Sequence, residues 1–291
     1  MPGDEVLLKG DDEETIEFRS LPDGHLLRTL SGHTSWISAL TLAANGRTLY
    51  SGDGAGKLKV WDLKTGKVTR ELTVGREGIR RLAVNPEETA LAVNCRDGTV
   101  HLWDLKQGGG LSLLSRPDWH SYDIAMSSDG RLLAFSAMRM GKVVTQVLSI
   151  WGLNPLTEIK TLPSDEDSNG LVQFLDGTHT LVTDGKLSTL ELWDVDRGVP
   201  TGTLKGQSDE SWSALAHSAE GNLLAAGANQ GRLVLWDLAT KGRIHAVQAH
   251  TATIMVMTFS RDGTRLITGC HDIGWEDRPG QAEVKVWAIR R

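Results

Sequence analysis

The sequence predicts an all-β fold made of repeated four-stranded antiparallel sheets, and three observations support this prediction. Six short phrases that alternate apolar and polar residues each end in Trp, usually followed by Asp. These Trp residues stand at positions 61, 103, 151, 193, 236 and 287, so the steps between them are about 42, 48, 42, 43 and 51 residues. A period of this length is typical of one β-propeller blade. No stretch of the chain shows a convincing 3.6-residue helical periodicity.

The strands of one repeat can be located in order from their alternation and from the turn residues between them. Ile37–Leu42 alternates as a first strand, and the Asn45-Gly46 turn leads to a second strand over Thr48–Ser51. A third strand ends at Trp61-Asp62, and a fourth follows over Val68–Leu72. Because one such sheet cannot bury its apolar face alone, neighbouring repeats are expected to stack.

The whole chain is predicted to form one domain of seven blades with an incomplete terminal blade, since 291 residues divide into close to seven such units. The first 30 residues match the last three strands of a blade in which Arg19 replaces Trp, and the C-terminus stops after a third strand. A six-bladed ring closed by residues 25–30 is the alternative, and an unpaired edge strand would also fit a piece of a longer protein. The predicted partial blade and six repeats cover residues 1–30, 31–74, 75–115, 116–163, 164–205, 206–247 and 248–291.

Composition and motifs exclude several classes of function. The net charge of −6 argues against a nucleic-acid partner, which requires clustered Lys and Arg. Cys95 and Cys270 are too few for a disulfide framework. No leader follows Met1 and no run of 18 apolar residues occurs, so we expect a cytoplasmic protein without a membrane partner. The dispersed His residues and the lack of a phosphate loop or nucleophile elbow predict no metal, no cofactor and no catalytic residues.

With its Gly32-His33 and Ala249-His250 pairs before first strands and its Trp-Asp endings, the chain resembles the WD40-repeat β-propeller family, in particular its bacterial members. In well-formed repeats of that family a His, a Ser or Thr, an Asp and the Trp make a buried hydrogen-bonded set. The resemblance implies incomplete sets here, because Ala55 occupies the Asp position of the His33 repeat and His250 has no matching Asp. The residues that the resemblance makes structural are His33, Trp61, Asp62, Asp97, Trp103, Asp104, Trp151, Trp193, Asp194, Trp236, Asp237, His250 and Trp287.

Candidate partner-binding residues gather in the loops that lead into first strands and in the turns that join second to third strands. By family resemblance this rim is the usual partner-binding face. Two insertions, at residues 138–142 and 271–280, lengthen turns on it, and Trp36 stands one residue before the core position of Ile37. Exposed aromatic and Arg side chains are common anchors of protein interfaces. The candidate contact residues are Trp36, Arg80, Arg96, His120, Arg139, Lys186 and Trp275.

The function expected from these observations is a noncatalytic scaffold that binds a protein or peptide partner. Two alternatives stay open. The first is a propeller hydrolase or lyase using the central channel, toward which Asp123 and His217 are the notable polar residues. The second is a sensory or docking module of a larger protein such as a bacterial kinase.

Overall fold

The computed structural model describes residues 6–10, 14–21, 23–75, 77–106, 111–114, 119–139, 145–164, 168–175, 177–207, 209–218, 222–271 and 282–289. These residues form seven antiparallel sheets, five of four strands and two of three, with one short 3-10 helix, η1 (Asn229–Gly231). The chain divides into two compact units: Met1–Leu133 with Ala137–Val144, and Ala134–Ser136 with Thr145–Arg291. The all-β prediction with four-stranded antiparallel blades is confirmed.

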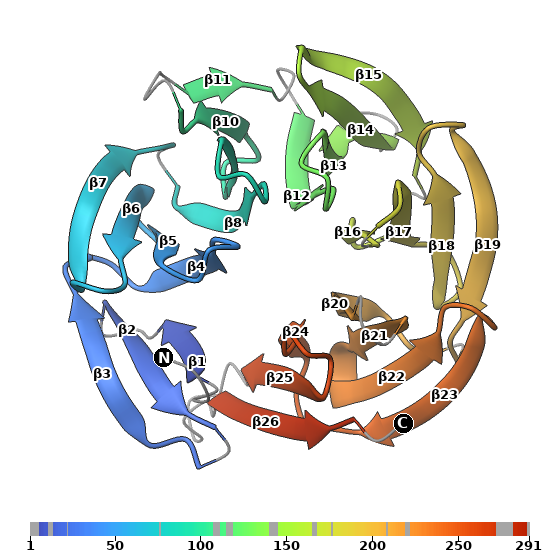
Figure 1. Cartoon of the computed structure of the whole chain (residues 1–291). Coiled ribbons are helices and arrows are strands. Elements are labelled where there is room, and N and C mark those ends of the chain that lie inside the picture. The colour runs from blue at the N-terminus through green and yellow to red at the C-terminus, as the bar shows by residue number, and fades with distance from the viewer. Residues whose placement is uncertain are drawn as a thin grey trace. The chain divides into compact units, whose positions relative to one another are not determined.

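The first unit contains the sheets β1–β3, β4–β7 and β8–β11 and the strand β12. The first strands β4, β8 and β12 of successive sheets lie against one another within this unit (Figure 1). Its strands are β1 (Val6–Gly10), β2 (Thr15–Ser20), β3 (Leu26–Ser31), β4 (Ile37–Leu42), β5 (Thr48–Asp53), β6 (Lys57–Asp62), β7 (Lys67–Thr73), β8 (Ile79–Val84), β9 (Ala90–Cys95), β10 (Val100–Asp104), β11 (Leu111–Leu113) and β12 (Trp119–Met126).

The second unit contains β14 and β15 and the sheets β16–β19, β20–β23 and β24–β26, while β13 (Leu132–Arg139) supplies residues to both units. Its own first strands also pack in sequence, β16 on β20 and β20 on β24. Its strands are β14 (Thr145–Leu153), β15 (Leu156–Pro163), β16 (Val172–Phe174), β17 (Thr180–Asp184), β18 (Thr189–Asp194), β19 (Val199–Lys205), β20 (Trp212–Ser218), β21 (Leu223–Ala228), β22 (Arg232–Asp237), β23 (Gly242–Gln248), β24 (Ile254–Phe259), β25 (Arg265–His271) and β26 (Ala282–Ala288).

The registers of the sheets repeat in detail. The pairing of third with fourth strands shifts at the repeat Trp, as between Val60 and Trp61 or between Leu235 and Trp236. The N-terminal sheet has the same shift between Phe18 and Arg19. Arg19 therefore stands at the Trp position of a blade, as the sequence predicts, and it forms an ion pair with Glu17 at 2.7 Å.

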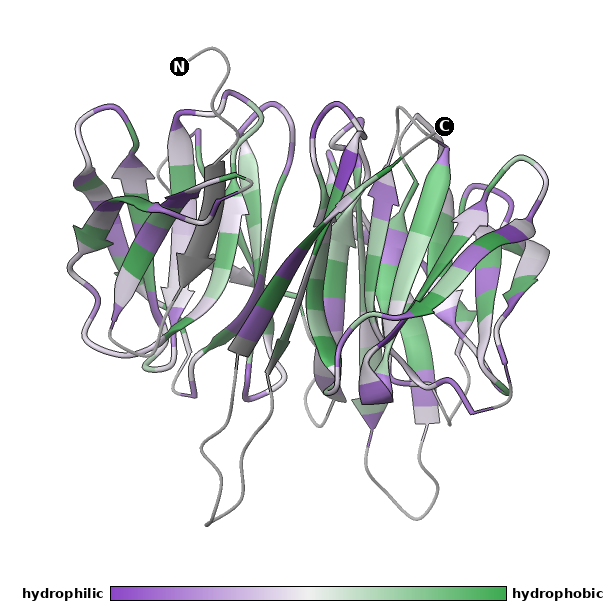
Figure 2. Ribbon diagram, turned by 90° about the horizontal axis from the view of Figure 1, so that it is seen from below, coloured by the Kyte–Doolittle hydropathy of each residue, from purple (hydrophilic) through white to green (hydrophobic). Residues whose placement is uncertain are grey.

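Second strands are the most deeply buried strands of their sheets, and the outer fourth strands are the most exposed. All six residues of β9 and of β21 are buried, whereas six of the seven residues of the outer strand β7 are exposed. Figure 2 shows hydrophobic and hydrophilic residues alternating along many of the strands. This alternation is expected where successive side chains point to opposite faces of a sheet.

Apolar cores form where neighbouring sheets of one unit pack together. In the first unit, Ile16 and Phe18 of the N-terminal sheet join Leu49 and Trp61 of the next sheet in one buried cluster. In the second unit, Trp212 and Trp236 meet edge to face with their ring centroids 5.4 Å apart. Full burial of an aliphatic side chain such as Ile16 or Leu49 contributes about 1.5–3 kcal/mol to stability.

Candidate partner-binding surface

A buried hydrogen-bonded network anchors the loop that carries Trp36. Trp61 Nε1–H donates to Ser51 Oγ at 2.8 Å, and Ser51 Oγ lies 2.6 Å from His33 Nε2. His33 Nδ1 lies 2.8 Å from Asp53 Oδ2. Since Ser51 Oγ already accepts the indole proton, its own hydroxyl donates to Nε2 and leaves the His33 proton on Nδ1, facing the carboxylate. Burial lowers the pKa of His33, opposed by the hydrogen bond to Asp53, so the ring is neutral at pH 7.

The prediction of an incomplete hydrogen-bonded set in the His33 repeat is therefore wrong, because the carboxylate of this set comes from Asp53 at the end of β5. Asp53 Oδ1 also accepts the backbone N–H groups of Ala55 and Lys57, each at 2.9 Å. The Ala55 position contributes only a backbone N–H. This set was not predicted because the Asp was expected in the turn after β5, at the position of Ala55, rather than at the end of the strand itself.

A second complete set surrounds His250, again against expectation. His250 Nε2 lies 2.7 Å from Thr268 Oγ1, which accepts Trp287 Nε1–H at 2.9 Å. His250 Nδ1 lies 2.7 Å from Glu283 Oε2, so a Glu on β26 takes the place of Asp. Among the described residues, His250, Cys270 and Glu283 also place potential metal-ligand atoms within 4.8 Å of one another. Both ring nitrogens are already engaged by protein groups, so this group is explained by the structural network.

The remaining repeat residues also have structural surroundings. The Trp-Asp carboxylates cap the turns that follow third strands, as when Asp62 Oδ1 accepts Lys64 N–H at 2.7 Å and Asp194 Oδ1 accepts Arg197 N–H at 2.9 Å. Asp104 and Asp237 accept backbone N–H groups in the same way, and Asp97 Oδ1 accepts Thr99 N–H. Among the repeat Trp residues, Trp151 Nε1–H donates to Ser149 Oγ at 2.9 Å, and Trp103 has Arg70 over its ring. Trp193 Nε1 finds no hydrogen-bond partner among the described residues.

We define the first-strand rim of the first unit as the described residues of the loops that lead into β4, β8 and β12 and of the turns that join β5 to β6 and β9 to β10. Trp36 lies on this rim and is 38% exposed. Its carbonyl accepts Gly54 N–H at 2.9 Å, and a Cβ on Gly54 would stand 2.2 Å from Trp36 Nε1. The indole ring thus packs directly against a glycine backbone, which fixes its position while leaving part of it open to solvent.

Arg96 lies over the Trp36 ring, with its guanidinium carbon 4.6 Å from the ring centroid. Arg96 occupies the position in its turn that Gly54 holds in the preceding sheet, and its backbone N–H donates to Gly78 O at 2.9 Å. A guanidinium over an indole is a favourable cation–π contact. The sequence named both residues as contacts, and the structure brings them together.

Arg80 is placed by a β-bulge at the start of β8. Ile79 pairs with Cys95 and Arg81 pairs with Asn94, so Arg80 is the extra residue. The equivalent bulges of β4, β20 and β24 leave out Ser38, Ser213 and Met255. Bulges re-aim side chains. The Arg80 guanidinium carbon lies 5.4 Å from the ring centroid of Tyr122.

The positive charge of Arg80 also affects the pKa of Arg96. Burial first, and then the positive charge of Arg80, lower the pKa of Arg96. Trp36 with Arg96 and Tyr122 with Arg80 are therefore two cation–π pairs whose cations interact electrostatically; we call these four residues the Trp–Arg ladder. Sequence reasoning missed Tyr122, although the phrase Ser121-Tyr122-Asp123 aligns with Ile79-Arg80-Arg81 and places Tyr122 at the Arg80 position.

His120 borders the ladder on the same rim. Its Nδ1 lies 3.2 Å from the backbone oxygen of Asp97, and Ser121 N–H donates to Gly98 O at 2.9 Å. Gly98 has φ +82°, and a Cβ there would stand 2.5 Å from His120 Nδ1. The exposed imidazole is therefore held against a backbone that only glycine can supply.

The three remaining predicted contacts are Arg139, Lys186 and Trp275. Arg139 is the exposed last residue of β13, and Lys186 is exposed in the β17–β18 turn of the second unit, where its carbonyl accepts the Thr189 hydroxyl at 2.7 Å. Trp275 lies outside the described residues. For these three side chains partner binding stays a prediction.

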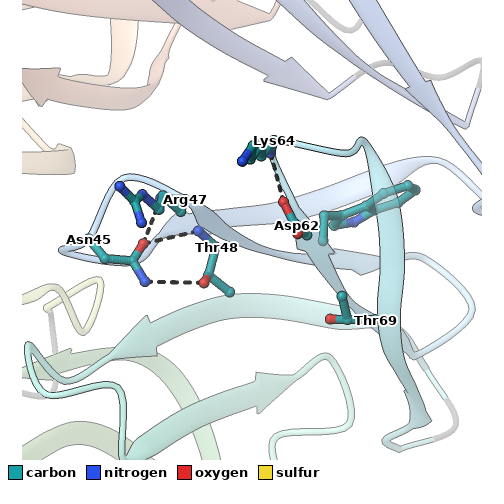
Figure 3. Close-up of a pocket in the computed structure, with 7 residues that line it drawn as sticks. Asn45, Arg47, Thr48, Asp62, Lys64 and Thr69 are labelled. Atoms are coloured by element: carbon teal, nitrogen blue, oxygen red, sulfur yellow. Dashed lines mark hydrogen bonds between the residues drawn. The ribbon is translucent and has the colours of Figure 1, made fainter. Parts of the chain in front are cut away.

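A hollow of about 410 Å³ lies at the opposite end of the β4–β7 sheet. Figure 3 shows that its polar groups are occupied by two turns: Asn45 Oδ1 accepts the N–H groups of Arg47 and Thr48, and Asp62 accepts Lys64 N–H. The Asn45 and Asp62 side chains in its walls therefore stabilise the turns of the blade. The lining residues are Asn45, Arg47, Thr48, Trp61, Asp62, Lys64 and Thr69.

The two polar residues singled out for a catalytic channel belong to different units. Asp123 Oδ1 accepts Arg81 Nε–H at 3.3 Å and the N–H of Ile124 at 3.0 Å, so it is an ion-paired carboxylate in the first unit. His217 lies on β20 of the second unit. No helix formed by the described residues is long and apolar enough to cross a bilayer.

Four-stranded antiparallel blades, shared bulges and buried His–hydroxyl–Trp sets define a repeat protein of the β-propeller class. The model of the WD40 family (WD domain, G-beta repeat) matches residues 24–62, 66–104, 198–237 and 241–272, which is just over half of the chain. The chain belongs to the WD40 repeat family, as the sequence predicts.

Curated relatives are similar at low identity. Autophagy-related protein 16 of Arabidopsis thaliana is 21% identical over 265 residues, covering 90% of this chain and 51% of the relative. The guanine nucleotide-binding protein subunit beta of Zea mays is 23% identical over 278 residues, covering 88% and 70%. Nuclear distribution protein PAC1 of Arthroderma otae is 26% identical over 226 residues, covering 75% and 43%. These relatives are plant and fungal proteins, so the expected bacterial type is not supported.

A chain in the crystal structure of a mitotic checkpoint complex has the same fold, with a TM-score of 0.78 at 17% identity over 98% of this chain and 86% of that one. The chain spans about half the length of the Arabidopsis relative and 70% of the Zea mays one. WD40 propellers of this kind are typical protein-interaction scaffolds.

Proposed function

We propose that this chain is a noncatalytic WD40 module that binds a protein partner through the first-strand rim of its first unit. The single observation that carries the proposal is the Trp–Arg ladder, in which Trp36 and Arg96 stack at 4.6 Å on an exposed rim. Aromatic and Arg side chains are the residue types that most often dominate binding energy at interfaces. The polar network under His33 and the glycine contact at Gly54 hold this surface in place before binding.

Several finer features belong to the same proposal. The seven sheets act as the blades of one domain over residues 1–291, with the repeat boundaries given above, and the protein works in the cytoplasm without a nucleic-acid or membrane partner. The period of the repeats supports the number of blades, and the net charge of −6 argues against a nucleic-acid partner. The guanine nucleotide-binding protein subunit beta and the checkpoint complex suggest by analogy that the ligand is a protein.

Partner capture from a lysate of the source organism tests the proposal, with wild-type protein, Trp36→Ala and the control Leu27→Ala on the beads. Leu27 is an exposed apolar residue of β3, away from the rim, at 53% exposure. We expect proteins that are retained by the wild type and by Leu27→Ala and lost by Trp36→Ala, as quantified by mass spectrometry. Equal retention by all three would move the binding surface elsewhere, and retention by none would contradict a scaffold.

A further inference from the structure

The two Arg side chains of the ladder differ from their neighbours because no carboxylate of the described residues is paired with them. Arg19 is paired with Glu17 at 2.7 Å, and Arg81, next to Arg80 in the chain, is paired with Asp123 at 3.3 Å. The guanidinium groups of Arg80 and Arg96 form no hydrogen bond or ion pair with any residue in the described part of the chain. Two cations that interact electrostatically are therefore left without a carboxylate partner among the described residues.

The aromatic rings hold these cations without using their donors. A guanidinium that stacks on a ring covers its flat face, whereas its N–H groups lie in the guanidinium plane and point outward. Arg96 lies over Trp36 at 4.6 Å and Arg80 over Tyr122 at 5.4 Å, and no described residue accepts a hydrogen bond from either guanidinium, so their N–H groups can serve a ligand oxygen. A carboxylate accepts two parallel hydrogen bonds from such N–H groups.

Mutual repulsion makes the pair a better anion site than either residue alone. Burial first, and then the positive charge of Arg80, lower the pKa of Arg96. An anion placed between the two groups reverses the sign of that interaction. The surrounding Trp36 and Tyr122 rings offer apolar contact to the chain that carries the anion.

We propose that the Trp–Arg ladder docks an acidic peptide segment of the partner, with Asp or Glu carboxylates held by Arg80 and Arg96 and with apolar atoms of the same segment against Trp36 and Tyr122. This inference rests on the proposed function, since it names the class of partner for the same surface. Nucleic acid fits poorly, because two cations on a chain of net charge −6 cannot follow a phosphate backbone.

Selection from a random twelve-residue peptide library displayed on phage tests the inference, because it reads out the preferred ligand chemistry directly. The baits are the wild-type chain, Trp36→Ala, Arg80→Gln, Arg96→Gln and the control Arg70→Gln. Arg70 makes the same kind of contact, over the Trp103 ring at 5.8 Å, but on the outer strand β7, so the control matches both the charge change and the stacking. Circular dichroism and the midpoint of urea unfolding verify that every bait is folded.

We expect peptides enriched on the wild type and on Arg70→Gln to be rich in Asp and Glu, and this enrichment to disappear on Arg80→Gln and Arg96→Gln. A synthetic peptide from the enriched pool should bind each ladder variant at least about tenfold more weakly in fluorescence anisotropy, because a charge-assisted hydrogen bond is lost. Enrichment of neutral or basic peptides that still depends on Trp36 would overturn the inference while sparing the proposed function. Peptides that bind all baits alike, or no enrichment, would contradict both.

A second comparison separates carboxylate from phosphate. The same synthetic peptide is made with phosphoserine at its acidic positions and measured in parallel. Equal or weaker binding of the phosphopeptide supports docking of Asp and Glu. Binding that is stronger by tenfold or more would assign the ladder to a phosphorylated partner and overturn the inference as stated.

Discussion

Removal of the Asp53 side chain tests which carboxylate completes the buried network. In Asp53→Ala, His33 Nδ1–H and the N–H groups of Ala55 and Lys57 all lose their acceptor. The imidazole is fully buried with the carboxylate, so its donor cannot turn to water. Each buried donor left without a partner costs about 1–3 kcal/mol, and the two backbone groups are nearer the surface. We expect a loss of about 3 kcal/mol in the free energy of unfolding.

Asp97→Ala is the matched control, because Asp97 stands at the turn position where the comparison of repeats looked for this carboxylate. Its Oδ1 accepts the N–H and hydroxyl of Thr99 in a partly exposed turn, so we expect a loss of only about 1 kcal/mol. Urea unfolding of wild type and both variants, followed by Trp fluorescence, measures the difference. Equal losses, or a larger loss in Asp97→Ala, would refute the network as described.

Three further predictions concern the same unit. Gly98→Ala, at φ +82° and with its new Cβ 2.5 Å from His120, should destabilise the protein by about 2 kcal/mol or more in urea unfolding, and an unchanged midpoint would contradict the close approach of Gly98 to His120. Burial raises the pKa of the Cys95 thiol to about 11, so iodoacetamide at pH 7.5 should leave it unmodified in the native protein and alkylate it in urea, as read by peptide mass spectrometry; native alkylation would contradict its burial. Burial lowers the pKa of His33, so below about pH 6.5 the unfolded chain binds a proton that the native chain does not bind. The free energy of unfolding should therefore fall as the pH drops from there to the native pKa. This fall should be smaller in His33→Gln, and an equal fall would refute a neutral His33.

The regular parts of this fold follow from the sequence because they are set by local alternation and by one recurring Trp. The strand order, the N-terminal three-stranded sheet and Arg19 at a Trp position could all be predicted in this way. The networks could not, because their carboxylates come from different places: Asp53 from the end of a second strand and Glu283 from a third strand. Alignment of the repeats places the carboxylates of both networks at one equivalent position, which neither Asp53 nor Glu283 occupies.

The candidate surface was predictable in part for a similar reason. Trp36 and Arg96 were recognisable as residues of rim loops, but their stacking depends on Gly54 and Gly78, whose lack of side chains lets the loops approach. Alignment of Ser121-Tyr122-Asp123 with Ile79-Arg80-Arg81 places Tyr122 at the Arg80 position, but no local pattern in the sequence marks the bulge that sets Arg80 apart. Contacts across neighbouring blades are tertiary, and periodicity alone does not specify them.

Hydrogen–deuterium exchange of the chain with and without a captured partner locates the binding surface. We expect slower exchange on binding in residues 32–36, 78–80, 96–98 and 119–122, which carry the Trp–Arg ladder and His120. The turns at residues 43–47 and 62–66, at the other end of the same sheet, should exchange as in the free protein. Protection confined to those turns, or to the second unit, would contradict the assignment of this rim as the partner-binding surface.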